Sequence, residues 1–572
     1  MRTARPFVRA ACGVAALIAL GSCATAFAPD RSARAPLLEG YGSVEMAITT
    51  DVPEARQLFL RGLLQTYAFN DAEAARAYRA ALALDPNCTM CAWGVAKAAG
   101  PNINNTDRGD LRDARRHLAW ARRHAERASE RERALVEALS ERYGPEPAAA
   151  EPTVAAIAPP TAPICGGGEA AKADPLDIVY AARMRAIADA YPDDDDVLVL
   201  YAEAEMIATR GDWWDKKTGA AAGAIGDVAD RLERALHRHP RHPALNHYLV
   251  HALDSSPRPE RALAAADRLG AIAPQSPHLL HMPSHIYVRV ARYGDAVRVN
   301  EEAIAAQARE NAAIRAQGFT PSNDWDGHNR HFLWFAALTA GRGELALEQA
   351  RALAAYVANA PNPTAEFMRS LPLLTLVRLE RWDDVLGSTT PAGDAGVAGP
   401  IAAYASGVAL VRLDRIAEAR ERSAALQAAL DAPALRGKTL MADDPVRTVL
   451  EILARRLQGE IAIAEQKADL ANASVAGGRD LETALNSSEP PLLGSMSRVA
   501  LGDLMLRAGR WNDAEQAYRA ELVVLPGNGW ALVGLQEALD RQGRGDDARR
   551  VRDESERVWA DADASLRKRM LR

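Results

Sequence analysis

Small and apolar residues recur at regular intervals from about residue 55 almost to the C-terminus. Two sets of positions, one near each end, carry the same residue types at the same spacing: Gly62, Ala74, Tyr78, Ala81 and Pro86 in the first, and Gly502, Ala514, Tyr518 and Pro526 in the second. Ala548 follows Ala514 by 34 positions, and the alanine that opens a second helix can be placed between the two ends at Ala262, Ala296, Ala346 and Ala419. A unit of this length with small residues at fixed crossing points indicates two packed antiparallel helices. The pattern predicts a stack of helical hairpins over most of the chain.

This spacing resembles that of the tetratricopeptide (TPR) repeat, in which two helices cross at recurring glycine, alanine and aromatic positions. The resemblance implies an all-α fold, a TPR helix-turn-helix solenoid wound as a right-handed superhelix with loop insertions. The interval from Ala262 to Ala296 is one repeat of 34 residues, whereas that from Ala296 to Ala346 is longer by 16. We therefore expect a loop insertion in the second interval.

Composition divides the chain into segments. Residues 145–173 are rich in proline, alanine and glycine, and we predict a flexible insertion that buries no core. The predicted segments are a signal peptide (1–22), a tether (23–50), N-terminal repeats (51–144), the insertion (145–173), central repeats (174–365) and C-terminal repeats (366–572). Two acidic-aromatic runs, 212–215 and 324–326, interrupt the central repeats. Such insertions either line a binding face or place a tryptophan over a helix end.

Length, composition and charge narrow the class of protein. A chain of 572 residues is too long for one ordinary core, and its low aromatic content of 5% suits many short packed helices. The net charge is −6, and basic residues are spread along the chain, so nucleic acid is not an expected partner. After the first 28 residues, no stretch has 18 uninterrupted apolar residues, and we predict no membrane-spanning helix there.

The first 28 residues are typical of an export signal, because three arginines precede an apolar run at 10–20 and small residues follow it. Leu20-Gly21-Ser22-Cys23 resembles the lipobox of bacterial lipoproteins, in which the cysteine is lipidated and becomes the mature N-terminus. The alternative is cleavage after Ala28, which would leave a soluble periplasmic protein. Both interpretations place the chain in the cell envelope facing the periplasm, and membrane contact is expected only through a lipid anchor on Cys23.

Histidines are concentrated in one part of the chain, since ten of the 12 lie between residues 237 and 331. If the alanine that opens each second helix is position 20 of its repeat, the first helices begin at 243, 277 and 327. Position 5 is then His247, His281 and His331; position 9 is His251 and His285; and position 2 is His278 and His328. Seven of these nine slots hold histidine, and the exceptions are Ala244 and Phe335.

Positions 2, 5 and 9 lie within about 60° of one another on a helix that turns about 100° per residue. The core positions of the first and third helices hold other residues: Leu249, Val250, Leu253, Leu333, Trp334 and Ala337. In the TPR family, positions 2, 5 and 9 of the first helix line the concave groove. The resemblance therefore implies that the seven histidines face one trough and are not core residues.

Imidazoles at this spacing are typical of transition-metal sites, because histidines four residues apart on a helix can reach one ion and rings of neighbouring repeats can meet. We predict one site, or two adjacent ions, bound by His247, His251, His278, His281, His285, His328 and His331. Copper, zinc or iron suits such ligands, whereas calcium and magnesium do not. A copper or iron pair would indicate oxidative chemistry, and zinc would indicate hydrolysis through an activated water. The sequence identifies neither the metal nor a catalytic residue.

The alternative function is a TPR scaffold that binds a peptide or an envelope protein partner in its groove without metal. If metal is bound, we expect it to be released below about pH 6, where imidazole gains a proton. His281→Ala is expected to lose metal without unfolding, because the side chain should point away from the core. Pro283 lies between His281 and His285 and is expected to kink their helix.

Cys88 and Cys91 form a CxxC pair just after Pro86, at the start of a predicted first helix. In an oxidising compartment the pair favours a disulfide, and the alternatives are a redox couple or a soft-metal site. Ala92 stands where a haem attachment site would need histidine. Cys165, in the predicted insertion, is left over and is expected to be either free or an alternative disulfide partner.

Beyond the repeat itself, the chain resembles one family of large bacterial TPR proteins over most of its predicted mature length. The motifs that carry this resemblance are Cys88-Thr-Met-Cys91-Ala-Trp-Gly94, Gly100-Pro-Asn-Ile-Asn104, His247-Tyr-Leu-Val-His251-Ala252, His281-Met-Pro-Ser-His285-Ile-Tyr287, His328-Asn-Arg-His331-Phe-Leu-Trp334 and Gly527-Asn-Gly-Trp530. The resemblance implies that the histidines belong to a family pattern, and it names no reaction. Where relatives carry a Trp-Tyr-Tyr run after two prolines, this chain has Pro490-Pro491-Leu492-Leu493-Gly494, so a ligand contact by those aromatics is not expected here.

Overall fold

The computed structural model describes residues 29–105, 110–144, 174–211, 213–215, 217–390, 396–441, 444–485, 489–494 and 496–570. The predicted signal peptide, Cys23 and the insertion with Cys165 lie outside the described residues.

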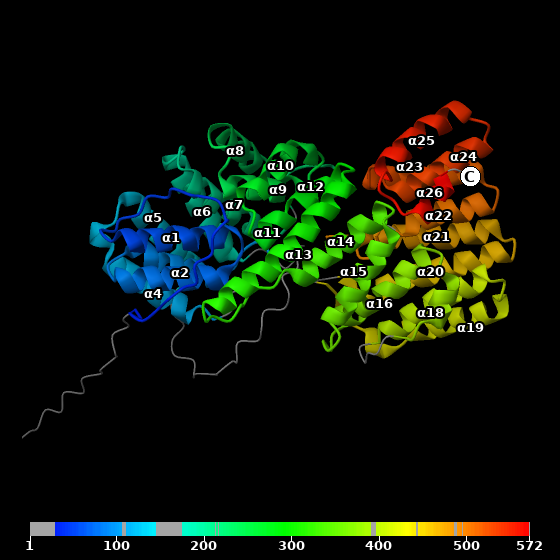
Figure 1. The fold of residues 1–572 in the computed structure, drawn as a ribbon, viewed down its shortest axis with the longest axis horizontal. Coiled ribbons are helices and arrows are strands. Elements are labelled where there is room, and N and C mark those ends of the chain that lie inside the picture. Colours follow the sequence, from blue (N-terminus) through cyan, green and yellow to red (C-terminus); the bar gives the residue numbers. More distant parts are fainter. Residues whose placement is uncertain are drawn as a thin grey trace, which may run out of the picture.

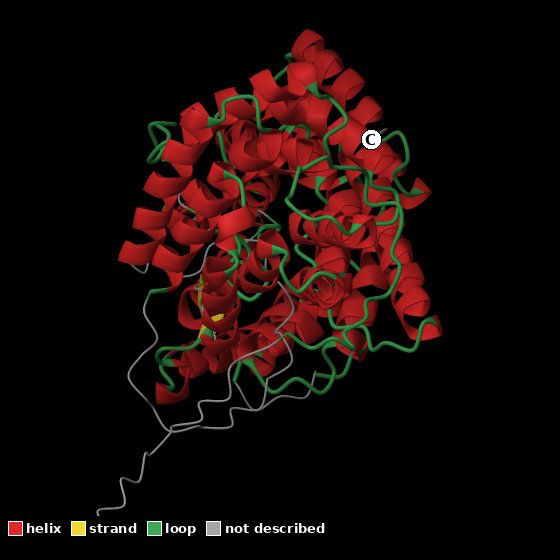
Figure 2. Ribbon diagram, turned by 90° about the vertical axis from the view of Figure 1, so that its left-hand side faces the viewer, coloured by secondary structure: helices red, strands yellow, loops and turns green. Residues whose placement is uncertain are grey.

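The described chain is almost entirely helical (Figure 2). Its first half contains α1 (Pro53–Tyr67), α2 (Asp71–Leu84), α3 (Thr89–Lys97), α4 (Arg112–Arg123), α5 (Glu130–Tyr143), α6 (Pro175–Ala190), α7 (Asp195–Ala208), α8 (Ile225–Arg238), α9 (Pro243–Asp254), α10 (Leu263–Ile272), α11 (Pro277–His281), α12 (Pro283–Arg289) and α13 (Tyr293–Ala316). Its second half contains α14 (Asp326–Thr339), α15 (Gly343–Tyr356), α16 (Pro363–Arg378), α17 (Trp382–Gly387), α18 (Ala398–Arg412), α19 (Ile416–Leu430), α20 (Val446–Ala464), α21 (Ala468–Ala484), α22 (Met496–Arg507), α23 (Trp511–Val524), α24 (Gly529–Arg541), α25 (Gly545–Val558) and α26 (Ala564–Met570). One short antiparallel strand pair, β1 (Thr439–Leu440) and β2 (Asp444–Pro445), completes the described regular structure apart from brief 3₁₀ turns.

The helices pair as the repeat pattern predicts, because small residues sit where two helices cross. A Cβ atom on Gly62 of α1 would lie 2.7 Å from the ring of Tyr78 on α2, and one on Gly502 would lie 2.4 Å from the ring of Tyr518. Real Cβ contacts are longer, so only glycine allows these aromatic rings to pack against the opposite helix. This confirms the predicted fold class, an all-α TPR solenoid.

Successive hairpins stack into a superhelix. Each helix packs mainly on its sequence neighbours, and first helices of adjacent repeats also touch, as α7 touches α9 and α18 touches α20. In Figure 1, α1 to α13 form one half of the molecule and α14 to α26 the other, with α9, α11, α12 and α14 near the junction.

The last repeats fold back against this junction. The indole nitrogens of Trp530 and Trp559 donate to the carbonyl oxygens of Leu338 and Thr339 at the end of α14, at 2.8 and 2.9 Å. The Tyr293 hydroxyl on α13 donates to the carbonyl of Pro526 at 2.9 Å. These contacts bring the C-terminal repeats beside the helices that carry the histidine cluster.

The segment before α1 is not a free tether where the structure describes it. Tyr41, Val44, Met46 and Ile48 are buried against the repeats. The backbone of Gln275 donates to the carbonyl of Gly40 at 3.1 Å, fixing the segment beside the start of α11. This packing could not be predicted from the repeat pattern, because the segment lacks the repeat spacing.

Among the described residues, no helix has both the length and the hydropathy required to cross a membrane.

Candidate metal centre

Six of the seven predicted ligands form two groups of three. The first trio consists of His247 and His251 from α9 and His278 from α11; the second trio consists of His281 at the end of α11, His285 from α12 and His328 from α14. Within each trio, one ring nitrogen from each histidine lies within 4.8 Å of the others. Each trio thus combines positions 5 and 9 of one repeat with position 2 of the next.

The Nε2 atoms of the first trio converge on His247. Its Nε2 lies 2.9 Å from Nε2 of His251 and 3.0 Å from Nε2 of His278. On the other side of the ring, Nδ1 of His247 lies 2.8 Å from the carbonyl oxygen of Tyr67. A carbonyl only accepts, so Nδ1 carries the proton and Nε2 presents a lone pair to the trio.

The second trio repeats this arrangement around His281. Its Nε2 lies 3.0 Å from Nε2 of both His285 and His328. Its Nδ1 lies 2.7 Å from Oδ1 of Asn300, whose amide nitrogen donates to the carbonyl of Ala296, so the amide oxygen is the atom that faces the ring. Nδ1 of His281 therefore donates, and its Nε2 is also a lone pair.

His285 is oriented by two carboxylates. Its Nδ1 lies 3.0 Å from Oδ2 of Asp254 and 2.9 Å from Oε2 of Glu489. Burial and the nearby Asp254 raise the pKa of Glu489 to about 7. Burial acts to raise the pKa of Asp254 as well, but the interaction with His285 outweighs it and lowers that pKa. Nδ1 of His285 donates to this pair, and its Nε2 points at the second trio.

The two trios adjoin each other inside an aromatic enclosure. Ring centroids of His251 and His285 are 6.3 Å apart, and those of His278 and His281 are 6.4 Å apart. Phe69 packs on all three rings of the first trio, with centroid distances of 4.8 Å to His247 and 4.9 Å to His278. It reaches them from a backbone with φ of 53°, a conformation that non-glycine residues adopt rarely.

Both acidic-aromatic runs and a phenylalanine extend this enclosure. The Trp325 ring stacks on the His278 ring with centroids 4.2 Å apart, and the Trp213 and His251 rings meet edge to face with centroids 6.2 Å apart. Phe332 of α14 lies 4.7 Å from His281. One tryptophan from each run, Trp213 and Trp325, therefore contacts the first trio.

The histidines are buried, which corrects the prediction of an open trough. His247 and His281 are 0% exposed, and the largest exposures are 5% for His251 and 6% for His328. Burial lowers the pKa of His247 to about 3 and lowers that of His278 well below the usual value, because a charged ring would lose its hydration. Burial therefore favours the neutral form of these rings, which is the form that binds metal.

His331 does not join either trio. It is buried and stacks on Trp334 with ring centroids 5.5 Å apart, and in the described part of the chain neither of its ring nitrogens has a hydrogen-bond partner. It occupies position 5 of the third repeat, as His247 and His281 do in theirs, but position 9 of that repeat is Phe335. The third set is therefore incomplete, and the predicted seven ligands reduce to six.

Sequence reasoning missed Asp254, Glu489, Asn300 and Phe69. Asp254 lies only three residues after His251, and this spacing is a weak indication that its carboxylate belongs to the site. Glu489 precedes Pro490 in the segment that departs from the family pattern, 204 residues from His285, and no spacing rule connects the two.

Pro283 interrupts the helix between its two histidines as predicted. α11 ends at His281 and α12 begins at Pro283, with Met282 between them. The break leaves His281 and His285 on one side, so that both Nε2 atoms reach the second trio.

Cys88 and Cys91 are joined by a disulfide and are both buried. This is the first of the states that the sequence left open. Cys88 is the N-cap of α3 and accepts a hydrogen bond from the backbone of Cys91.

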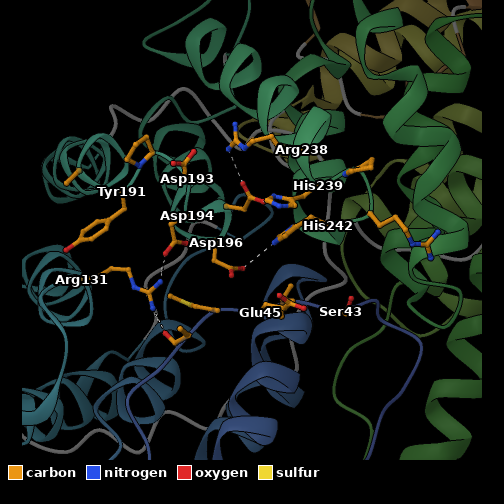
Figure 3. Close-up of a pocket in the computed structure, with 18 residues that line it drawn as sticks. Ser43, Glu45, Arg131, Tyr191, Asp193, Asp194, Asp196, Arg238, His239 and His242 are labelled. Atoms are coloured by element: carbon orange, nitrogen blue, oxygen red, sulfur yellow. Dashed lines mark hydrogen bonds and ion pairs between the residues drawn. The ribbon is translucent and has the colours of Figure 1, made fainter.

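A separate polar pocket of about 830 Å³ lies between residues 43–47 and the turns that precede α7 and α9 (Figure 3). Most of its charges are paired, including Arg131 with Asp194 and His239 with Asp195. Tyr67 connects the pocket to the first trio, since its hydroxyl donates to Asp196 at 2.8 Å while its carbonyl accepts from His247.

No protein-family model and no curated protein sequence matches this chain. Among solved structures, it is similar to the human IFIT1 dimer with m7Gppp-AAAA at 11% identity and a TM-score of 0.31, over 89% of this chain and 91% of that one. It is similar to the APC/C hetero-tetramer Cut9–Hcn1 at 12% identity and a TM-score of 0.25, over 91% and 76%. It is similar to the TPR domain of P58(IPK) at 10% identity and a TM-score of 0.24, over 86% and 98%. These are distant likenesses between TPR-type helical arrays, and membership of the large bacterial family stays a prediction.

Proposed function

We propose that this chain is a cell-envelope metalloprotein that binds two transition-metal ions, one in each histidine trio. The observation that supports this most directly is the convergence of Nε2 atoms, at 2.9 to 3.0 Å from the central histidine of each trio. In metal sites, a ligating histidine almost always donates its other ring N–H to a carbonyl or carboxylate. His247, His281 and His285 each have such an acceptor at Nδ1.

Proton counting indicates a cation beside two of these rings. A neutral imidazole has one proton, and in both His281 and His285 that proton is on Nδ1. Their Nε2 lone pairs then face each other at 3.0 Å, which is repulsive unless a cation lies beside both. An added proton on His285 could also bridge this contact, because Asp254 and Glu489 would stabilise its charge, so the metal content of the protein decides between a metal ion and a proton.

The spacing and ligand type indicate which ions fit. Nitrogens bound tetrahedrally at about 2.0 to 2.1 Å from one ion are about 3.3 Å apart. The two short contacts in each trio need to lengthen by only a few tenths of an ångström to reach this spacing, and the third pair of nitrogens lies within 4.8 Å. All-imidazole ligation suits zinc, copper or iron and does not suit calcium or magnesium.

Three protein ligands leave a coordination position open, which is typical of catalytic sites. Two adjacent ions would support oxidative chemistry if they are copper or iron, and hydrolysis through an activated water if they are zinc.

The test is elemental analysis of full-length protein purified without a histidine tag, then stripped by chelator and reconstituted with copper, zinc and iron. We expect about two ions per chain, one for each trio. His247→Ala and His281→Ala should each reduce this to about one, and His331→Ala should leave it unchanged. A stoichiometry below about 0.2 with every metal would refute the proposal and favour the peptide-binding scaffold.

A further inference from the structure

The two trios differ in what lies behind their ligands. Within the described residues, the hydrogen-bond partners of the first trio are other histidines and one backbone carbonyl, that of Tyr67. The second trio has Asp254 and Glu489 on Nδ1 of His285. This difference deepens the function proposed above and rests on it.

Among the described residues, the rings that cover the first trio are uncharged. Phe69, Trp325 and Trp213 cover its rings. Behind His247, the Tyr248 ring lies at 5.1 Å. Two acids act on Tyr248, and Lys97 offsets both. Burial raises the pKa of Asp71 whereas Lys97 acts to lower it, and Lys97 forms a buried ion pair with Glu203 at 2.8 Å. Because Lys97 offsets them, these carboxylates offer little charge to an ion in the first trio.

The second trio is next to negative charge. Asp254 is buried, so its charge is weakly screened, whereas Glu489 is partly exposed and its charge is screened more. Donation from His285 to a carboxylate makes its Nε2 a stronger base and offsets part of the charge of a bound cation. A divalent ion is then far better compensated in the second trio than in the first.

We infer that the two sites select ions of different charge: the second trio, with Asp254 and Glu489, is a site for a divalent ion such as Zn²⁺ or Cu²⁺, and the first trio favours a monovalent ion, Cu⁺. Imidazole ligands suit copper in general, and an uncharged aromatic enclosure stabilises one positive charge better than two. Asp254 and Glu489 act as specificity-determining residues through His285.

The experiment is a competition titration of metal-free, full-length protein. With Zn²⁺, we expect one tight equivalent and a second that binds at least about tenfold more weakly. His281→Ala should remove the tight equivalent, and His247→Ala should remove the weak one. With Cu⁺ under anaerobic reducing conditions, the first trio should bind its ion without the loss of affinity that it shows for Zn²⁺.

The variants Glu489→Gln and Asp254→Asn isolate the charge. Each should weaken the tight Zn²⁺ site by about 10- to 100-fold and leave Cu⁺ binding in the His281→Ala background unchanged. Glu521→Gln is the matched control, because Glu521 is a buried carboxylate that accepts a hydrogen bond from Asn528 and belongs to neither trio.

The outcomes separate the two proposals. If the wild-type protein binds neither ion, the proposed function itself fails. If two Zn²⁺ ions bind with equal affinity, or if Glu489→Gln weakens both sites equally, the metal function stands and the difference between the sites is refuted.

Discussion

The substitution His281→Ala tests the metal centre most sharply, because this ring is the hub of the second trio. It removes one of three ligand nitrogens and both of the 3.0 Å contacts to His285 and His328. It also leaves Oδ1 of Asn300 without the N–H that it accepts at 2.7 Å. His251 and His278 are untouched, so the first trio should keep its ion.

The substitution should change both the free energy of unfolding of the metal-free protein and the stabilisation that bound metal provides. The sequence alone suggested that this variant would fold normally, but His281 is completely buried. Truncation of a buried side chain costs about 2 to 5 kcal/mol of stability, and an orphaned buried acceptor costs about 1 to 3 kcal/mol. Metal binding acts in the opposite direction, since an ion at 100 times its Kd stabilises the folded chain by about 2.7 kcal/mol per site. Wild type should therefore gain about 5 kcal/mol from two ions, and His281→Ala about half of that.

The assay is thermal unfolding followed by intrinsic fluorescence, with and without metal, combined with elemental analysis of the same samples. Circular dichroism checks that helix content is retained. His331→Ala is the matched control: its ring is also buried but lies outside both trios, so it should lower the metal-free midpoint and keep the full metal-dependent shift. The reasoning is refuted if His281→Ala keeps both ions, or if His331→Ala loses as much metal.

Three further predictions concern pH, the disulfide and export. Burial lowers the pKa of His331 to about 3, against about 6.5 in the unfolded chain, so the unfolded state binds more protons below pH 6.5 and the folded state loses stability as the pH decreases. Between pH 7.5 and 5.5, this one residue should cost the metal-free protein about 1.4 kcal/mol of unfolding free energy. Denaturant unfolding of His331→Phe should show a correspondingly weaker pH dependence. Reduction of Cys88–Cys91, which closes a loop of about four residues, should cost about 2 kcal/mol, and mass spectrometry should find no alkylation of this pair before reduction. Cys23→Ser should move the protein from the membrane fraction to the soluble fraction of the cell, and an unchanged distribution would argue against the lipid anchor.

Local rules were sufficient for much of this protein. Gly62 and Tyr78 predicted their helix crossing, because a crossing of this kind requires a residue without a side chain. The histidine phase was also a local property, since helical geometry places positions 2, 5 and 9 on one face. Even the division of α11 from α12 followed from one residue, Pro283.

Tertiary structure decided how the histidines are grouped and what surrounds them. The sequence placed seven rings on one face, but contacts between repeats sorted six of them into trios and left His331 beside Trp334. Phe69 from the N-terminal repeats contacts His247, and Glu489 from the C-terminal repeats contacts His285. Helical periodicity acts over a few residues, whereas these contacts depend on how the whole array curves back on itself, and no short-range pattern records that curvature. The residues that distinguish one trio from the other are therefore visible only in the folded chain.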